Sequence, residues 1–401
     1  MDRNRFPTMT TASSNTTVTK LGSTQALVID DVLRYIEYSS PAISLVIGSP
    51  GLIFNIINTV IFLKLGVRDC MSLCLLSLSL TDNASLLFGL MSAWCRLTYS
   101  IAATTGTFLY LDPLSVWVLL VQCQFCFYDL STYTTVFISL ERCACVMLPF
   151  RFKELFTYGR SVVVLTLLYT FTFLLHVFFF AFAGFRPVLD PRTNATRLVM
   201  WNSPRKKVVD DYIQPLNNIF LASLSLTLIL ITSGIMVTGL VKSAEFQEKS
   251  NAKALTRKMG VQTRRTSGVA SDASLGRMKI TSRSDTGTAM DSDRAADHRP
   301  KSQRADVKEE LKAKNKNMRL ARMVTVLAII CFVCNSVRFG VMVALYMDFE
   351  LRATGKLSLT VHVISGLAFV TQVINCSVNT VVYLTCNPSY TRAFRKLFRQ
   401  A

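Results

Sequence analysis

Residues 161–185 read SVVVLTLLYTFTFLLHVFFFAFAGF, a run of 25 residues without Asp, Glu, Lys or Arg. An α-helix rises about 1.5 Å per residue, so about 20 such residues cross the hydrocarbon core of a bilayer. In lipid a helix satisfies its own backbone hydrogen bonds, and this run lacks the alternating pattern of a barrel strand. The stretch therefore predicts a membrane-spanning helix.

Six further runs of the same kind lie along the chain, and each contains at most one Asp, Glu, Lys or Arg. They cover residues 39–63, 70–95, 113–140, 213–241, 323–347 and 357–391. Of the 401 residues, 51% are hydrophobic and only 17% are charged, whereas soluble chains carry about 25% charged residues. We therefore predict an all-α membrane protein, a seven-transmembrane helix bundle.

The composition also argues against several classes of function. The net charge of +19 would suit nucleic acid only on a soluble basic fold, so we expect no nucleic-acid partner. The chain has only 3 His, and it contains neither a phosphate-binding glycine loop nor a nucleophile elbow. We expect no enzymatic activity and no cofactor beyond a simple ion.

The distribution of basic residues predicts the orientation, because cytoplasmic loops are rich in Lys and Arg. With the N-terminus outside, the inner segments hold 28 Lys and Arg and the outer segments hold 13. The loop 242–318 contributes 18 of these residues, and without it the contrast is small. Two glycosylation sequons, at Asn15 and Asn194, then face outward. We predict a multi-pass protein of the plasma membrane with an extracellular N-terminus.

Changes in composition divide the chain into five parts. We expect an extracellular disordered tail (1–38), five helices (39–241), a disordered basic cytoplasmic loop (242–318), two helices (319–385) and an amphipathic helix with a tail (386–401). Good helix formers at 305–316 should extend the sixth helix beyond the membrane. Within the loop, Arg264-Arg265-Thr266-Ser267 is either a phosphorylation site at Ser267 or part of a linker that binds anionic lipid heads.

Polar side chains inside the spans are costly and therefore mark functional positions. Each of the first, second and third runs contributes one such side chain near its middle, and the seventh contributes two that share a helix face. They are Asn55, Asp82, Ser131, Asn375 and Asn379.

Two short motifs lie at the inner ends of the spans. Glu141-Arg142-Cys143 follows the third run and is followed by Pro149-Phe150, and the seventh run contains Asn379-Thr380-Val381-Val382-Tyr383. Their order and spacing, together with Asn55 and Asp82, resemble the (Asp/Glu)-Arg-Tyr and Asn-Pro-x-x-Tyr motifs of rhodopsin-like (class A) G-protein-coupled receptors. The resemblance covers about residues 41–242 and 318–399. Within that family, residues 139–153 resemble gastropod chemosensory receptors, with FMRFamide-receptor-like neuropeptide receptors as neighbours.

The resemblance implies that the chain transmits the binding of an extracellular small molecule or peptide, a chemosensory cue or a neuropeptide, to a heterotrimeric G protein. Arg142 would alternate between Glu141 and groups exposed when the sixth helix swings outward, and Phe150 would enter a groove on the G protein. The implied coupling and switch residues are Glu141, Arg142, Pro149, Phe150, Asn379 and Tyr383, with Asn55 as a structural residue.

The resemblance also implies a sodium site in the middle of the membrane. Its ligands would be Asp82, Ser131, Asn375 and Asn379, whose oxygen atoms suit a hard monovalent cation. The alternative is a hydrogen-bonded polar core that holds no ion.

The ligand is expected in the outer half of the bundle, between the third, sixth and seventh spans. The candidate contacts are Gln124, Tyr128, Phe332, Asn335, Arg338, Phe339, Phe369 and Gln372. A buried guanidinium needs an acceptor, so Arg338 would pair with Asp348 or Glu350, extend outward, or meet a carboxylate or carbonyl-rich group of the ligand. Asp129 has no counterpart in the family, and it would be protonated, paired with a hydroxyl group or hydrogen-bonded to His176.

The chain departs from the family pattern in several places. Trp117 occupies the third-span position of the family's structural disulfide, and residues 186–210 contain no Cys. Cys334 and Thr380 stand where the sixth and seventh spans usually have prolines, and Lys314 lies about where the usual acidic partner of the arginine is found. Cys386, just after the last span, is a candidate for palmitoylation.

The rival hypothesis is a seven-span transporter or another non-signalling membrane protein. A transporter would need a continuous polar pathway and often shows internal repeats. No repeat is visible in the sequence, and the polar residues of the spans converge on one region of the bundle.

Overall fold

The computed structural model describes residues 12–67, 69–148, 151–190, 194–242, 245, 301–347 and 358–399. This part of the chain contains seven helices that are long and apolar enough to cross a membrane, which confirms the predicted bundle. They are Tyr38–Leu65, Cys70–Thr105, Pro113–Met147, Tyr158–Ala181, Lys206–Lys242, Asn317–Met347 and Val363–Cys386.

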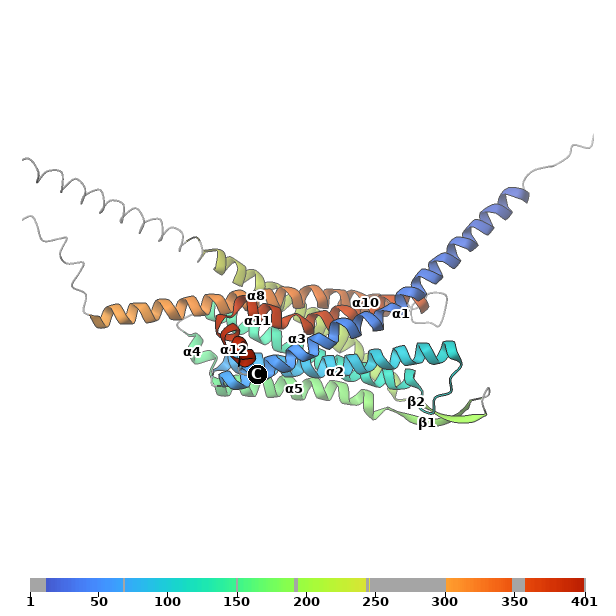
Figure 1. The fold of residues 1–401 in the computed structure, drawn as a ribbon, viewed down its shortest axis with the longest axis horizontal. Helices are drawn as coiled ribbons and strands as arrows, with labels where there is room; N and C mark the ends of the chain where they lie inside the picture. The colour runs from blue at the N-terminus through green and yellow to red at the C-terminus, as the bar shows by residue number, and fades with distance from the viewer. Residues whose placement is uncertain are drawn as a thin grey trace, which may run out of the picture.

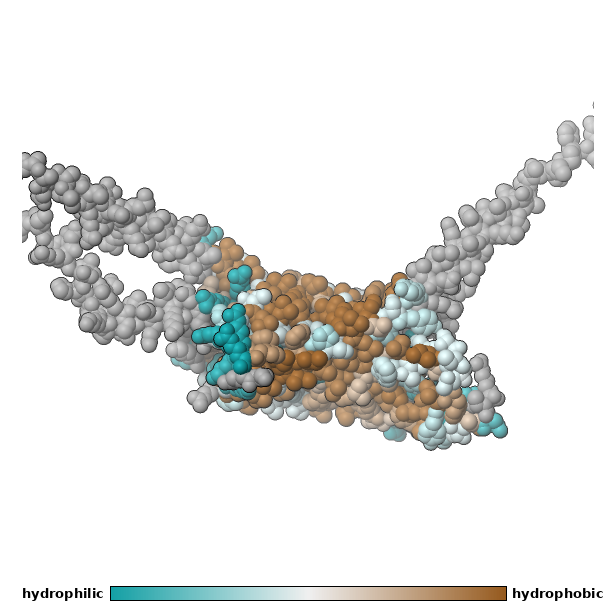
Figure 2. All heavy atoms as spheres, in the orientation of Figure 1, coloured by the Kyte–Doolittle hydropathy of each residue, from teal (hydrophilic) through white to brown (hydrophobic). Residues whose placement is uncertain are grey.

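The helices lie side by side in one bundle (Figure 1). Its main elements are α1 (Ala12–Leu65), α2 (Cys70–Thr105), α3 (Pro113–Met147), α5 (Tyr158–Ala181), α8 (Lys301–Met347), α10 (Ser358–Ser377) and α11 (Asn379–Cys386). The fifth span begins with the short α6 (Lys206–Val208) and the π-helical turns η1 (Val209–Ile213) and η2 (Leu216–Leu221). The middle of the bundle presents a broad apolar surface, with hydrophilic residues gathered toward its ends (Figure 2). This is the surface that a membrane-spanning bundle requires.

The two ends of the bundle carry different small elements (Figure 1). One end holds a hairpin of β1 (Ala183–Asp190) and β2 (Ala195–Asn202), and the other holds α4 (Phe152–Leu155) and the amphipathic α12 (Pro388–Arg399). The helix α12 confirms the predicted short helix after the last span. On this helix Tyr390 is fully buried, and burial raises the pKa of its hydroxyl group above the ordinary value.

Two boundaries differ from the sequence-based expectation, and a third agrees with it. The helix α1 begins at Ala12, so residues 12–38 continue the first helix rather than forming a separate tail. The fourth span ends at Ala181 instead of residue 185, because the chain enters β1 there. The helix α8 begins at Lys301, which confirms the predicted extension of the sixth helix. Ser267 and most of the loop around it lie outside the described residues.

The seventh span is interrupted without a proline. The helix α10 ends at Ser377 and α11 begins at Asn379, with Val378 between them. The Val381 amide donates to the Val378 carbonyl over 3.0 Å, which tightens the backbone there to the i to i+3 pattern. A discontinuity therefore exists beside Asn379 although Thr380 replaces the family's proline.

The segment between the fourth and fifth spans forms a β-hairpin. Its strands are antiparallel. Ala183 pairs with Asn202 at one end of the ladder, and Asp190 pairs with Ala195 at the other. The Asp112 amide donates to the Leu198 carbonyl over 3.0 Å, and the Leu198 amide donates to the Tyr110 carbonyl over 2.8 Å. All 11 cysteines are free, so main-chain hydrogen bonds take the place of the family's disulfide in fixing this segment to α3.

One side chain joins the hairpin to the first turn of α3. The Ser115 hydroxyl group accepts from the Met200 amide over 2.9 Å and donates to Asp112 Oδ2 over 2.5 Å, while Asp112 caps the helix by accepting from the Ser115 amide over 3.0 Å. Ser115 and Asp112 are both buried. Their contacts therefore couple the order of the hairpin to the start of the third helix.

We predict that Ser115→Ala speeds hydrogen exchange at the amides of Met200 and Leu198, because the serine hydroxyl group holds β2 on α3. Loss of such a bond costs about 1 kcal/mol, which corresponds to roughly fivefold faster exchange. Hydrogen exchange read by mass spectrometry checks this. Thr104→Ala is the matched control, since Thr104 bonds only to the Ile101 carbonyl within α2 and is exposed. Equal exchange of β2 in parent and Ser115→Ala would contradict this role.

Candidate functional site

A buried ion pair joins the third and sixth spans. Asp129 on α3 is 6% exposed, and its Oδ1 accepts from Nη1 of Arg338 on α8 over 2.5 Å. Arg338 is also 6% exposed, and its guanidinium stacks over the rings of Phe125 at 5.0 Å and Tyr128 at 5.4 Å. Two charges of opposite sign inside an apolar bundle are tolerated because each supplies the countercharge of the other.

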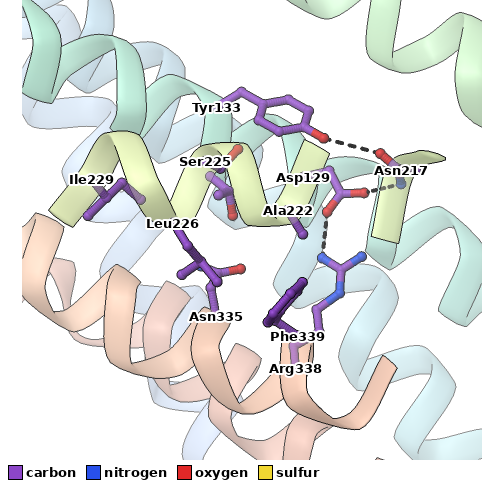
Figure 3. A pocket seen from close by; sticks show the side chains of 11 residues that line it. Asp129, Tyr133, Asn217, Ala222, Ser225, Leu226, Ile229, Asn335, Arg338 and Phe339 are labelled. Carbon is purple, nitrogen blue, oxygen red and sulfur yellow. Dashed lines mark hydrogen bonds and ion pairs between the residues drawn. The ribbon is translucent and has the colours of Figure 1, made fainter. Parts of the chain in front are cut away.

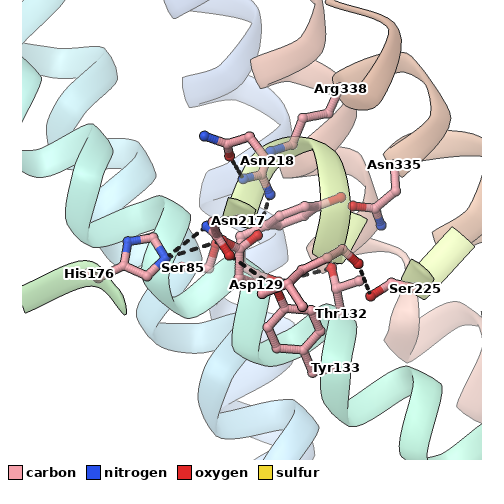
Figure 4. A network of polar contacts seen from close by, with 12 residues as sticks. Ser85, Asp129, Thr132, Tyr133, His176, Asn217, Asn218, Ser225, Asn335 and Arg338 are labelled. Atoms are coloured by element: carbon pink, nitrogen blue, oxygen red, sulfur yellow. Dashed lines mark hydrogen bonds and ion pairs between the residues drawn. The ribbon is translucent and has the colours of Figure 1, made fainter. Parts of the chain in front are cut away.

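The second carboxylate oxygen of Asp129 is hydrogen-bonded to residues of the fourth and fifth spans. Asp129 Oδ2 accepts from Asn217 Nδ2 over 2.7 Å and from His176 Nε2 over 3.2 Å (Figure 4). His176 Nδ1 in turn lies 3.0 Å from Gln122 Nε2, so the imidazole accepts there and donates to the carboxylate. One carboxylate thus connects four spans.

The fifth span reaches this network through a π-helical turn. Asn217 and Asn218 are consecutive in η2, yet both are buried. Asn217 also accepts from the Tyr133 hydroxyl group over 3.1 Å, and Asn218 Oδ1 accepts from Arg338 Nη2 over 2.9 Å. In a regular α-helix neighbouring side chains point about 100° apart, and the wider turn lets both amides face the ion pair.

These contacts supply partners for Arg338 and Asp129. Among the described residues, Arg338 contacts Asp129 and Asn218, while the expected partners Asp348 and Glu350 lie outside the described residues. The expected hydrogen bond between Asp129 and His176 is confirmed. Asp129 is paired with Arg338, and no hydroxyl group is hydrogen-bonded to it among the described residues.

Two cavities meet at Arg338. A cavity of about 250 Å³ lies between α1, α2, α3, α8 and α10, and its wall includes Arg96, Trp117, Phe125, Arg338 and Gln372. A small cavity of about 20 Å³ lies on the other side, against the fifth span (Figure 3). Asp129, Tyr133, Asn217, Asn335, Arg338 and Phe339 are among the residues that line it.

The structure divides the predicted ligand contacts into three groups. Arg338, Phe369 and Gln372 line the larger cavity, and Asn335 and Phe339 join Arg338 in lining the small one. The remaining three, Gln124, Tyr128 and Phe332, line neither cavity.

Sequence reasoning missed the far wall of the larger cavity. The Arg96 guanidinium lies 5.0 Å from the centre of the Trp117 ring, which links α2 to α3 near the position of the missing disulfide. Val121 and Phe125 follow Trp117 at a spacing of four residues, so one face of α3 lines the cavity. That spacing was visible in the sequence.

A second polar cluster surrounds Asp82 in the middle of the bundle. Asp82 is fully buried and accepts from Ser131 Oγ over 2.6 Å and from Asn379 Nδ2 over 2.5 Å. Among the described residues no basic nitrogen lies within 4.0 Å of this carboxylate. The structure thus brings Asp82, Ser131 and Asn379 together, and among the described residues no hydrogen bond joins the buried Asn375 to Asp82.

Asn55 ties the first span to the second and seventh. The side-chain Nδ2 of Asn55 donates to the Cys376 main-chain carbonyl over 2.7 Å. The main-chain carbonyl of Asn55 accepts from Ser79 Oγ over 3.0 Å. Its side-chain oxygen accepts from Asn58 Nδ2 over 3.0 Å, and Asn58 Oδ1 accepts from Tyr390 on α12. The side chain at position 55 therefore connects the bundle's polar centre with the helix that follows it.

At the opposite end from the hairpin, α3 ends in a buried pair of charges. Arg142 Nη2 donates to Glu141 Oε1, and the two residues are 5% and 0% exposed. The second carboxylate oxygen of Glu141 and the Nε of Arg142 are buried without a partner among the described residues, as is the Tyr383 hydroxyl group. Pro149 and Phe150 lie outside the described residues, and so does the Lys314 side chain. This end of α3 therefore holds buried polar groups that lack hydrogen-bond partners among the described residues.

A family model described as the 7 transmembrane receptor (rhodopsin family) matches residues 55–383. The match covers most of the chain, from the middle of the first span to near the end of the seventh, so the chain belongs to the rhodopsin family of seven-transmembrane receptors. Proteins of this family are signalling receptors in membranes and not enzymes. No curated protein shows a significant match to the chain.

We predict that Asp129→Leu and Arg338→Leu each destabilise the bundle by about 3–5 kcal/mol, because each leaves a buried charge without its partner. The double variant should regain most of that loss, since it buries no unpaired charge. Thermal unfolding of the parent, the two single variants and the double variant in lipid nanodiscs measures this double-mutant cycle. Additive effects of the two substitutions would show that the pair does not couple α3 to α8.

Proposed function

We propose that the chain is a plasma-membrane receptor that transmits the binding of an extracellular ligand to a heterotrimeric G protein. The observation that carries this is the position of Arg338, which lies in the wall of the larger cavity and also holds α8 to α3. A ligand in that cavity can change the sixth span by competing for one side chain. Binding of the ligand and binding of the G protein then favour the same conformation of the bundle.

The ligand is a small molecule or the end of a peptide, in keeping with a chemosensory cue or a neuropeptide. The cavity is lined mainly by apolar and aromatic side chains, and its wall includes two arginines, Arg96 and Arg338. A ligand with an apolar body and a carboxylate or carbonyl-rich group matches this lining. A ligand screen in cells that express a promiscuous G protein would identify it.

At the inner end, Arg142 is proposed as the switch. Its bond to Glu141 keeps the guanidinium inside the bundle, and the unpartnered groups around it favour a second arrangement with new contacts. Pro149 and Phe150 would lie on the G-protein side, with Asn379 and Tyr383 at the break in the seventh span.

The proposed orientation places the N-terminus and the hairpin outside the cell. Asn194 is exposed at the hairpin turn, which suits glycosylation. Asn15, Ser267 and the half-exposed Cys386 are proposed for glycosylation, phosphorylation and palmitoylation. An antibody to an N-terminal tag should bind intact cells, and binding only after permeabilisation would reverse the orientation.

A sodium ion fits the chemistry of the Asp82 cluster. The carboxylate is buried without a cation among the described residues, and Ser131 offers a second hard oxygen ligand. When bound, the ion would supply the positive charge that this carboxylate lacks. The hydrogen-bonded core without an ion remains the alternative.

The transporter hypothesis is not supported, because the chain belongs to a receptor family. The two cavities that meet at Arg338 also lie in one part of the bundle.

We predict that Arg142→Ala lowers basal nucleotide exchange on a G protein in reconstituted membranes by about tenfold, within the usual range of coupling free energies. Phe150→Ala should act in the same direction. Arg160→Ala is the control, since this exposed arginine lies at the same end and bonds only to the Glu154 carbonyl and its own helix cap. Unchanged exchange in both variants, at equal surface expression, would contradict G-protein coupling.

We predict that Asp82→Asn abolishes any sodium dependence of nucleotide exchange, because the substitution removes the carboxylate charge that attracts the ion. In the parent, replacing potassium by sodium should lower exchange. Ser92→Ala is the control, since this buried serine lies on the same helix and bonds only to the Gly89 carbonyl. Equal sodium effects in parent and Asp82→Asn would favour the polar core without an ion.

A further inference from the structure

A second cluster of metal-ligating side chains lies at the inner end of the bundle, away from both cavities. Cys70 and Cys74 are one turn apart on α2, and Glu141 approaches them from α3. Their two sulfur atoms and one carboxylate oxygen all lie within 4.8 Å of one another, and the three residues are 8%, 0% and 0% exposed. No feature of the proposed ligand or G-protein sites requires two thiols at this position.

We propose that Cys70, Cys74 and Glu141 form a binding site for a thiophilic divalent metal ion such as Zn²⁺. The sulfur atoms of Cys70 and Cys74 are 4.0 Å apart. Two thiolates on one tetrahedral zinc ion, each bonded at about 2.3 Å, lie about 3.8 Å apart, so little movement is needed to seat the ion.

Glu141 provides separate evidence that this cluster can bind a metal ion, because one of its carboxylate oxygens has no hydrogen-bond partner among the described residues. Its Oε1 accepts from Arg142, but its Oε2 is buried and has no hydrogen-bond partner among the described residues. A buried carboxylate oxygen without a partner is costly, and a metal ion beside the two sulfurs would satisfy it. The neighbouring hydroxyl group of Ser161 lies 2.7 Å from the Cys70 sulfur and can donate to the thiolate, as outer partners of metal ligands usually do.

The charges of such a site are compatible with the Arg142 contact. Binding releases the two thiol protons to solvent, and two thiolates, one carboxylate and one divalent ion carry a net charge of −1. This equals the charge of Glu141 beside two neutral thiols, so Arg142 still faces one negative charge. Because Oε2 would be fixed on the metal while Oε1 holds Arg142, metal binding should favour the resting position of this arginine.

Cobalt is a suitable probe because its complexes with thiolates absorb light. The full chain in nanodiscs, kept reduced with a phosphine, should bind one Co²⁺ and show a sulfur-to-cobalt charge-transfer band that Zn²⁺ removes. Cys70→Ser/Cys74→Ser should lose the band, and Glu141→Gln should weaken binding by at least about tenfold. Cys331→Ser/Cys334→Ser is the matched control, since these two cysteines are also buried and one turn apart on one helix; it should keep the band.

A band of equal intensity in the parent and in Cys70→Ser/Cys74→Ser, or no band in the parent, would overturn the site. Should the double variant fail to fold, two single variants decide the question. Cys70→His keeps a zinc ligand and should retain tight binding, whereas Cys70→Ser should not, and equal binding by both would overturn the site.

The regulatory effect rests on the proposed function and has its own measurement. Zn²⁺ should lower basal nucleotide exchange in the parent and leave Cys70→Ser/Cys74→Ser unchanged. Since the cobalt spectrum needs no G protein, failure of coupling cannot be mistaken for failure of the site. Metal binding without any change in exchange would support the site and contradict its effect on Arg142.

Discussion

The contact between Asp129 and Arg338 is the constraint around which the other spans are arranged. A charged group brought into an apolar bundle loses several kcal/mol of hydration, so neither residue is tolerable alone. The pair forces α8 against α3, and the remaining acceptor capacity of Asp129 brings in His176 and Asn217. The π-helical turn of the fifth span follows from the same need, because two consecutive asparagines must face one pair of charges.

This arrangement also explains how the chain can manage without two features of its relatives. It has no disulfide at the hairpin end of the bundle, and the hairpin is fixed instead by main-chain bonds to Tyr110 and Asp112, just before α3, and by Ser115. The seventh span has no proline at Thr380, yet it is broken at Val378. Arg338 lies in the wall of the larger cavity, and Arg142 lies toward the far end of the helix that bears Asp129. Helix α3 therefore physically connects the two sites.

Much of the fold could be predicted from the sequence, because membrane-spanning helices must be long and apolar whatever their neighbours are. The cluster of Asp82, Ser131 and Asn379 could also be predicted, since a family resemblance fixed their positions. The Asp129–Arg338 pair was missed although a signal existed. Each is the only charged residue in its own run. A single charge inside a membrane is costly, so an acidic and a basic residue in neighbouring spans are expected to form an ion pair.

Other features could not have been predicted, because they depend on contacts between distant segments. The hairpin pairs with main-chain groups of Tyr110 and Asp112, just before α3, and nothing in residues 186–210 specified those partners. The π-helical turns and the division of the expected ligand contacts between two cavities likewise arise from packing rather than from local pattern. Gln124 and Tyr128 share a helix face with the cavity wall in the sequence, yet they are buried against neighbouring helices.

The most direct measurement is the distance, in lipid nanodiscs, between the ends of the third and sixth spans that lie opposite the hairpin. Nitroxide labels carried by unnatural amino acids at the exposed positions Met147 and Arg319 would report it by pulsed electron paramagnetic resonance. If the Asp129–Arg338 pair governs the sixth span, Arg338→Ala should add a population at longer distance that the parent lacks. An identical distance distribution in the parent and in Arg338→Ala would contradict the account.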